Sequence, residues 1–213
     1  MKKVKEITCL AIIFLFALFL LPHQADAAST KTKNKKAKAA YVKLLSKSTI
    51  GWGSGKCNTK NLKYSYMDIN GDGVSELLLY NMEASHADGW NRIYAYVGGK
   101  AKSLGAFTDI EICKNKNFFT DTYSNHGVTR TRYYRLKSNG KKVLLAEYTS
   151  SYGGYPHGAK GQVVKKKDAS YGYTIYYYNF KVNGKKTTYK KCMQVVNSLK
   201  KKAKYNKISW KYK

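Results

Sequence analysis

A series of short strand-like runs between residues 62 and 189 constrains the fold of this chain more than any other feature. The runs are rich in Tyr, Val and Ile, which favour strands. Gly98-Gly99, Asn139-Gly140 and Asn183-Gly184 are typical of tight hairpins. Regularly spaced hairpins favour an antiparallel meander over alternating strand–helix units. The predicted strands are residues 62–67, 76–81, 92–97, 128–136, 143–148, 162–166, 171–180 and a short last one over 207–212.

Apolar residues at helical spacing predict one amphipathic helix before the strands and one after most of them. The first helix is predicted over 36–47 and the second over 188–202, with Thr187 or Thr188 as its cap. The predicted fold class is therefore α+β, with an antiparallel meander and a short helix near each end. The 213 residues fit one domain of ordinary size, and we expect a single β-rich domain over 39–213.

The N-terminal residues 1–27 are typical of a secretory signal peptide. Three lysines precede an unbroken apolar run over 9–21, which is too short to span a membrane comfortably. Ala25-Asp26-Ala27 then supplies small residues for cleavage after Ala27, with Ala28 as the alternative. An uncleaved N-terminal anchor is the competing interpretation. Residues 28–38 are rich in Lys and are predicted to form a disordered basic arm.

Charge is distributed very unevenly along the chain, whose formal net charge is +28. Cleavage after Ala27 would leave 37 basic and 10 acidic residues, a net charge of +27. Residues 28–67 hold ten Lys and residues 181–213 hold twelve Lys, and neither flank has an acid. The two flanks thus carry +22 of the total. Such a chain attracts polyanions at long range, and salt weakens that attraction.

The composition indicates non-specific attraction of a polyanion rather than sequence-specific recognition of a nucleic acid. Of the 40 basic residues, 36 are Lys and four are Arg, whereas bidentate reading of guanine favours Arg. For a secreted chain we expect an anionic cell-wall or extracellular polymer, with no specific nucleic-acid recognition. The competing interpretation is that the lysines only maintain solubility. We expect a secreted monomer that is either released or retained electrostatically at the wall.

The segment from Asp68 to Glu76 is the most specific chemical signal in the sequence. Side-chain oxygens of Asp68, Asn70, Asp72 and Glu76 fall at loop positions 1, 3, 5 and 9, and Val74 offers its backbone carbonyl at position 7. An oxygen-rich loop of this kind, with Gly at position 6, suits Ca²⁺. Leu follows at position 12, where an EF-hand needs Glu, and the chain continues as a strand. A plain turn between strands, or neutralisation by a Lys, is the alternative.

This segment also carries a resemblance, through Asp68-Ile69-Asn70-Gly71-Asp72-Gly73 followed by Glu76-Leu77-Leu78-Leu79. It resembles a signature of small secreted proteins of gut clostridia and their relatives, and it is similar to the calcium loops of integrin-type (FG-GAP) propeller blades. The resemblance implies Ca²⁺ held by the side chains of Asp68, Asn70, Asp72 and Glu76 and the backbone of Val74. This chain has Asn70 and Glu76 where Asp is commoner. The resemblance implies a metal and a compartment, and no activity.

Other reactive residues form no recognisable motif. Cys57, Cys113 and Cys192 would remain after cleavage, and we interpret Cys192 as reduced and buried. Pairs such as Cys113 with His126, or Ser151 with His157, have no diagnostic spacing. The acids considered for glycan hydrolysis are Glu83, Asp88, Asp109, Glu111 and Asp121, and no spacing selects two of them.

The function expected from the sequence is non-catalytic binding of an anionic polymer at the bacterial surface. The Lys-rich flanks would attract the polymer, and Tyr-rich loops, including 150–158, would offer stacking contacts. A secreted metal-dependent hydrolase or nuclease is the alternative. A membrane-disrupting toxin is less consistent with the sequence, because the predicted helix over 188–202 is needed for the core.

Overall fold

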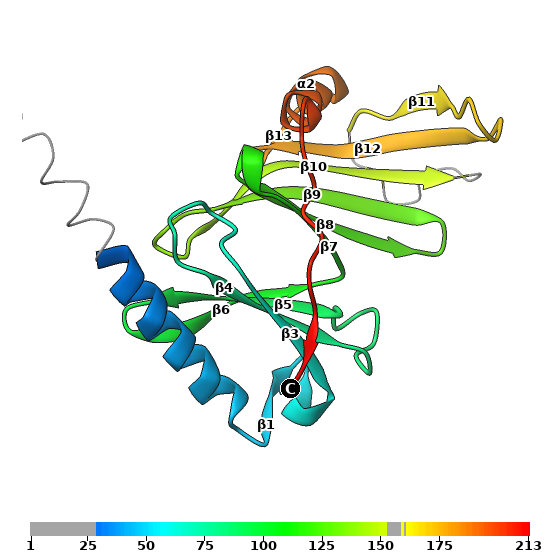
Figure 1. Ribbon diagram of the computed structural model, residues 1–213. Helices are drawn as coiled ribbons and strands as arrows, with labels where there is room; N and C mark the ends of the chain where they lie inside the picture. Colours follow the sequence, from blue (N-terminus) through cyan, green and yellow to red (C-terminus); the bar gives the residue numbers. More distant parts are fainter. Residues whose placement is uncertain (1–28, 153–158, 160) are drawn as a thin grey trace, which may run out of the picture.

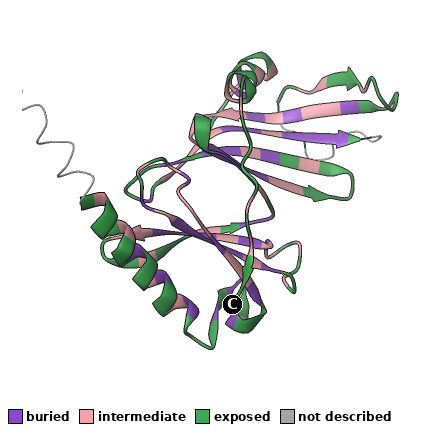
Figure 2. Cartoon of the chain, viewed as in Figure 1, coloured by how far each residue is buried: buried purple, intermediate pink, exposed green. Residues whose placement is uncertain are grey.

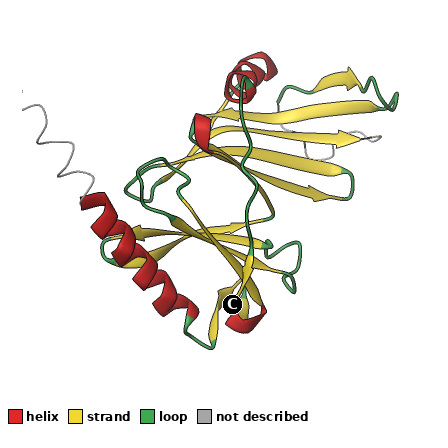
Figure 3. Ribbon diagram, in the orientation of Figure 1, coloured by secondary structure: helices red, strands yellow, loops and turns green. Residues whose placement is uncertain are grey.

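The computed structural model describes residues 29–152, 159 and 161–213, and it is built in four layers (Figure 1). Two antiparallel sheets face each other in the middle, and a helix covers the outer face of each one (Figure 3). The predicted α+β class with an antiparallel meander is therefore confirmed. The predicted signal peptide over 1–27 lies outside the described residues.

The first sheet has five strands in the order β14-β3-β4-β5-β6, and a two-stranded ribbon of β1 and β2 precedes it along the chain. Four of its strands follow one another as a meander, and the fifth comes from the C-terminus. The bounds are β1 Thr49–Trp52, β2 Gly55–Asn58, β3 Leu62–Met67, β4 Glu76–Asn81, β5 Asn91–Val97, β6 Lys100–Phe107 and β14 Lys211–Tyr212.

The second sheet has seven strands, six of them in the order β11-β12-β10-β9-β8-β7, with β13 paired to the edge of β12. Its strands β7 to β10 follow one another as a meander, and β11 is the edge strand next to β12. The bounds are β7 Asp109–Cys113, β8 Phe118–Asn125, β9 Val128–Leu136, β10 Lys142–Tyr152, β11 Val164–Lys167, β12 Thr174–Val182 and β13 Lys185–Lys186. Short 3-10 turns follow β2 and β7, at Thr59–Asn61 and Lys114–Lys116.

The burial of β4 explains why its sequence is a continuous apolar run rather than an alternating one. Leu77 and Leu79 belong to the core cluster under the N-terminal helix, while Leu78 belongs to the cluster between the two sheets. A strand that is covered on both faces needs apolar residues at every position. Figure 2 shows the buried residues gathered along the strands of both sheets.

The N-terminal helix is longer than predicted and spans residues 29–45. The expectation of a disordered arm over 28–38 is therefore wrong for the described residues from 29 onward. Lys and Ala are good helix formers, and fully buried Ala37 anchors this stretch against the first sheet beside Tyr41. The lysines point away from the sheet and stay exposed, so the helix can form in spite of its charge.

The second helix, α2 (Tyr189–Lys200), confirms the predicted helix with bounds that are one or two residues shorter. Thr188 caps it by accepting a hydrogen bond from the backbone N–H of Lys191 at 3.4 Å. Cys192 and Val196 are buried against the second sheet. Among the described residues, no helix has the length and apolar character needed to cross a membrane.

The C-terminal segment joins the two halves of the molecule. After α2 it runs back along one side to the first sheet, where β14 pairs with β3 (Figure 1). On the way, Asn206 forms an isolated bridge with Ile112 of β7. The predicted last strand over 207–212 is thus present and shorter. The predicted strands do not include β1, β2, β6, β7, β8 or β13, although Asp109–Cys113 of β7 does alternate polar and apolar residues.

Candidate calcium site and charged surface

The predicted metal loop connects β3 to β4 as the turn of a hairpin. Met67 pairs with Glu76, so the loop is closed at its base by the last ladder pair of the two strands. Ile69 and Val74 turn their side chains into the core and are almost fully buried. Their burial leaves the polar residues between them to line the turn. The local fold is therefore set by the alternation of apolar anchors with oxygen-bearing side chains.

Side-chain oxygens of the loop accept hydrogen bonds from the backbone of the same loop. The carboxylate of Asp68 accepts from the N–H groups of Gly71 and Gly73, at 2.7 and 2.9 Å. Asn70 accepts from the N–H of Asp72 at 3.0 Å, and Asp72 accepts from the N–H of Val74 at 2.9 Å. The structure thus brings three of the predicted ligands to one turn.

Glu76 is the buried member of the set, with 3% of its surface exposed. Its carboxylate accepts the N–H of Ile69 at 2.8 Å across the base of the loop. Burial, followed by the nearby charges of Asp72 and Asp68, raises the pKa of Glu76 to about 8. A cation beside these carboxylates would act in the opposite direction and favour the charged form.

The N-terminal helix lies directly over the loop. The side chain of Asn34 accepts a hydrogen bond from the backbone N–H of Ser75 at 3.1 Å. Burial raises the pKa of Tyr41, and the charges of Glu76 and Asp72 raise it further, so the charge of the loop acts on this helix. The sequence alone does not connect this helix with the loop, because no local pattern indicates a contact between residues that are 41 positions apart.

The donor set fits a hard cation in its chemistry, since every predicted ligand offers oxygen. Each carboxylate oxygen that accepts one N–H keeps a second acceptor position, so the turn and an ion are compatible. Among the described residues, however, no three His, Cys, Asp or Glu side chains form a compact metal-ligating group. Calcium at Asp68, Asn70, Asp72, Val74 and Glu76 therefore stays a prediction.

The basic flanks supply the two helices that form the outer layers of the molecule, and they also include β1, β2, β3 and β14. The helix over 29–45 carries six lysines and all six are exposed: Lys31, Lys33, Lys35, Lys36, Lys38 and Lys43. The lysines of α2 and of the segment that follows it are also exposed. The helix α2 lies on the far side of the second sheet, and the segment after it runs back along one side of the molecule (Figure 1). The acidic loop, by contrast, lies inward of the N-terminal helix. Folding therefore brings the acidic loop beneath the basic helix, although no ion pair joins the two among the described residues.

A row of alternating charges crosses the second sheet, and no pattern in the sequence predicted it. The register aligns Asp121 of β8, Arg132 of β9, Glu147 of β10 and Lys181 of β12 side by side. Asp121 pairs with Arg132 at 2.5 Å, and Glu147 pairs with Lys181 at 2.7 Å. Asp121 also accepts the N–H of Thr108 at 2.9 Å. Only the strand register shows that these four residues lie side by side. An acid inside a predicted strand, such as Glu147, was the one signal in the sequence that pointed to a charged pair within the sheet.

The structure does not bring Cys113 and His126 together as a catalytic pair. Cys113 pairs with Phe118 at the start of β8, while His126 follows the end of that strand. Eight residues of extended chain separate His126 from Phe118, which corresponds to roughly 26 Å. His157 lies outside the described residues, as does most of the loop over 150–158. Cys192 is free and fully buried, as interpreted from the sequence.

Comparisons with known proteins add no family assignment. A scan of protein-family models found no match to the chain, and searches of curated proteins and of solved structures found none either.

Proposed function

We propose that this is a secreted, non-catalytic binding protein for an anionic wall, matrix or glycan polymer, with Ca²⁺ as a structural ion in the Asp68–Glu76 loop. One observation carries the proposal: the two Lys-rich flanks contain no acid, and all of their lysines except Lys63 and Lys181 are exposed. Lysines spread over a large surface suit a flexible, repetitive polyanion better than a single small ligand. The attraction needs no fixed geometry, so it also fits electrostatic retention of a monomer at the wall.

The proposed role of calcium is to hold the first hairpin and, through it, the basic helix. Three acids of the loop lie within nine residues, and their mutual repulsion falls when a cation binds. The hydrogen bond from the N–H of Ser75 to the side chain of Asn34 joins the loop to the helix, so a loop stabilised by calcium would also hold the helix in place. Extracellular sites of this kind bind with a Kd of roughly 10⁻⁴–10⁻³ M.

A calcium titration followed by calorimetry and melting temperature tests the metal. Calcium should raise the melting temperature of the parent, and Asp72→Ala should abolish that response. Asp88→Ala is the matched control, because Asp88 lies in another loop and bonds to Ser85, and it should respond as the parent does. If no response appears up to several millimolar calcium, the loop is only a turn.

Binding to purified cell walls at increasing salt tests the polymer. We expect tight binding at low salt and release at high salt, because surface charges are screened. Replacing Lys31, Lys35 and Lys38 by Gln should weaken binding more than the same change at Lys137, Lys141 and Lys167. Equal loss in the two triple variants, or no binding, contradicts the proposal. Release of polymer fragments during incubation would instead favour the hydrolase or nuclease alternative.

A further inference from the structure

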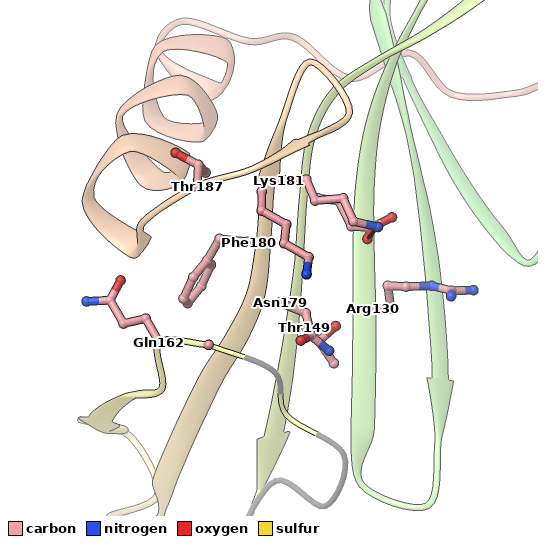
Figure 4. Close-up of a pocket in the computed structure, with 10 residues that line it drawn as sticks. Arg130, Thr149, Gln162, Asn179, Phe180, Lys181 and Thr187 are labelled. Atoms are coloured by element: carbon pink, nitrogen blue, oxygen red, sulfur yellow. Dashed lines mark hydrogen bonds and ion pairs between the residues drawn. The ribbon is translucent and has the colours of Figure 1, made fainter.

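A pocket of about 450 Å³ opens at the edge of the second sheet (Figure 4). Ladder pairing joins β12 to β11 through residues 174–177 and to β13 through residues 181–182. The three residues between, Tyr178, Asn179 and Phe180, are outside both ladders, and the chain around Gly161 and Gln162 passes this gap. The volume is within the range of small-molecule sites.

The strand at this gap is irregular in a way that shapes the pocket. Glu147 pairs with Lys181 and Thr149 pairs with Tyr178, so Asn179 and Phe180 together oppose the single residue Tyr148. This is a β-bulge, and bulges commonly turn a side chain toward a site. Asn179 also has a φ of 55°, in the left-handed region. Strain of this kind is common at binding sites.

The charge of the lining is positive after its one acid is paired. Glu147 forms an ion pair with Lys181 at 2.7 Å. Arg130 and Lys186 also line the pocket, and neither has a carboxylate partner among the described residues. The guanidinium of Arg130 lies 5.7 Å from the centre of the Tyr123 ring on β8, and Figure 4 shows it extending away from the other labelled side chains, so Arg130 stands at the rim of the pocket. From the rim, this exposed side chain can turn toward a bound oxyanion, and a guanidinium is a planar fork that binds an oxyanion through two hydrogen bonds.

The rest of the lining suits a ligand rich in hydroxyl groups. Thr149, Thr187, Asn179 and Gln162 supply hydroxyl and amide groups, and Phe180 supplies an apolar wall. The carbonyl oxygen of Gln162 accepts the N–H of Tyr189, which fixes the orientation of its amide. A few placed polar groups beside one apolar wall determine the orientation of a small ligand.

We infer that this pocket binds one saccharide unit that bears a singly charged oxyanion. A single oxyanion suits the lining, because Lys181 neutralises Glu147 and only Arg130 and Lys186 remain without a carboxylate partner among the described lining residues. The oxyanion can be the carboxylate of an acidic sugar or a phosphodiester that joins sugar or polyol units. The inference deepens the proposed function, because it names the unit of the polymer that is bound. It rests on the proposed function only in taking that saccharide unit to be part of a polymer.

Calorimetry with short soluble probes tests the pocket at physiological salt, where diffuse attraction is weak. The probes are a trisaccharide of galacturonic acid, a short glycerol phosphodiester oligomer and neutral maltotriose. At least one charged probe should bind and maltotriose should bind at least tenfold more weakly. The probe that binds better identifies the source of the oxyanion. Equal binding of all three, or binding of none, overturns the inference.

Two charge-removing variants, each with a matched control, locate the site. Arg130→Gln should weaken binding of the charged probe about tenfold, while Arg135→Gln on the same strand should change it less than twofold. Lys186→Gln should weaken binding about fivefold, while its neighbour Lys185→Gln should not. All four residues are exposed, so folding should survive in each variant, and melting temperatures check this. Equal losses in variant and control would show diffuse attraction only.

The two proposals fail in different ways. If walls bind in a salt-dependent manner but the short probes do not, the pocket inference is overturned and the proposed function stands. If the charged probe binds through Arg130 but walls do not, the pocket stands and the proposed polymer is wrong.

Discussion

At the scale of single residues, Glu76 makes the stability of the loop depend on pH. Its folded-state pKa of about 8 is above the ordinary value of 4.5, so the folded chain keeps a proton that the unfolded chain releases. The metal-free protein should therefore lose stability as pH rises from about 4.5 to about 8. One pKa unit corresponds to about 1.4 kcal/mol, which makes the loss on the order of a few kcal/mol.

Urea denaturation at several pH values, with chelator and with calcium, measures this dependence. Glu76→Gln should have a flatter profile than the parent in chelator, because it removes the carboxyl group whose pKa burial raises. Calcium should flatten the parent profile, since a cation favours ionised Glu76. Parallel profiles of parent and variant in chelator would contradict this assignment.

Two glycines of the loop separate backbone strain from contact with the helix. Gly71 and Gly73 have φ values of 76° and 79°. A Cβ at Gly71 would meet nothing within 4 Å, whereas one at Gly73 would lie 2.6 Å from Cγ2 of Thr30. Gly71→Ala should therefore cost about 1–2 kcal/mol of unfolding free energy, and Gly73→Ala should cost more.

The double variant Thr30→Ser with Gly73→Ala identifies the cause of that difference. It removes the methyl group that the new Cβ would meet, so its stability should return to that of Gly71→Ala. Chemical denaturation of the four proteins makes the comparison. Equal stability of the two single variants would show that the helix does not rest on Gly73.

At the scale of elements, the charged row joins four strands at the margin of the core between the sheets. On the same face, the neighbouring pair Phe119–Tyr134 belongs to that core, so the row marks where apolar packing ends. Asp121 is 1% exposed, while the side chain of Lys181 is 39% exposed. Breaking a buried pair leaves an uncompensated charge, whereas an exposed pair contributes little.

The two ends of the row should therefore differ in their effect on stability. Asp121→Asn should cost about 3 kcal/mol, because it leaves Arg132 without its partner. Lys181→Met should cost less than about 1 kcal/mol. Equilibrium urea unfolding measures both values, and a cost for Lys181→Met as large as that for Asp121→Asn would contradict the difference in burial.

At the scale of the whole molecule, the last residues link layers that are far apart in the sequence. The side chain of Asn115 donates to the carbonyl of Lys202 at 2.9 Å and accepts the N–H of Lys204 at 3.0 Å. β14 then covers the edge of β3, the strand that leads into the calcium loop. An uncovered edge strand is a template for pairing with another chain.

Ending the chain after Lys204 should lower the midpoint of unfolding and promote self-association through β3. Size-exclusion chromatography and thermal unfolding measure the two effects. Tyr212→Ser is the control, because it keeps the backbone ladder and removes only a side chain that is 73% exposed. If the truncated chain stays monomeric and as stable as the parent, the segment does not protect this edge.

The sequence by itself determined those features that depend on local pattern. Alternation and turn residues predicted β3, β4 and β9 with the observed bounds, and helical spacing predicted both helices. The oxygen spacing of the loop and the division of charge are also properties of the chain alone. Such signals are readable because they recur within a few residues, where the backbone period fixes which side chains share a face.

Only the tertiary structure decided which distant residues meet. The register of four strands aligned Asp121 with Lys181, and packing on the first sheet turned the expected arm into helix over the loop. The bulge at Asn179 likewise depends on how β12 pairs with β10. A shift of one residue in register would turn every side chain to the other face. No local pattern in the chain specifies such pairings, because they are set by burial across the whole fold.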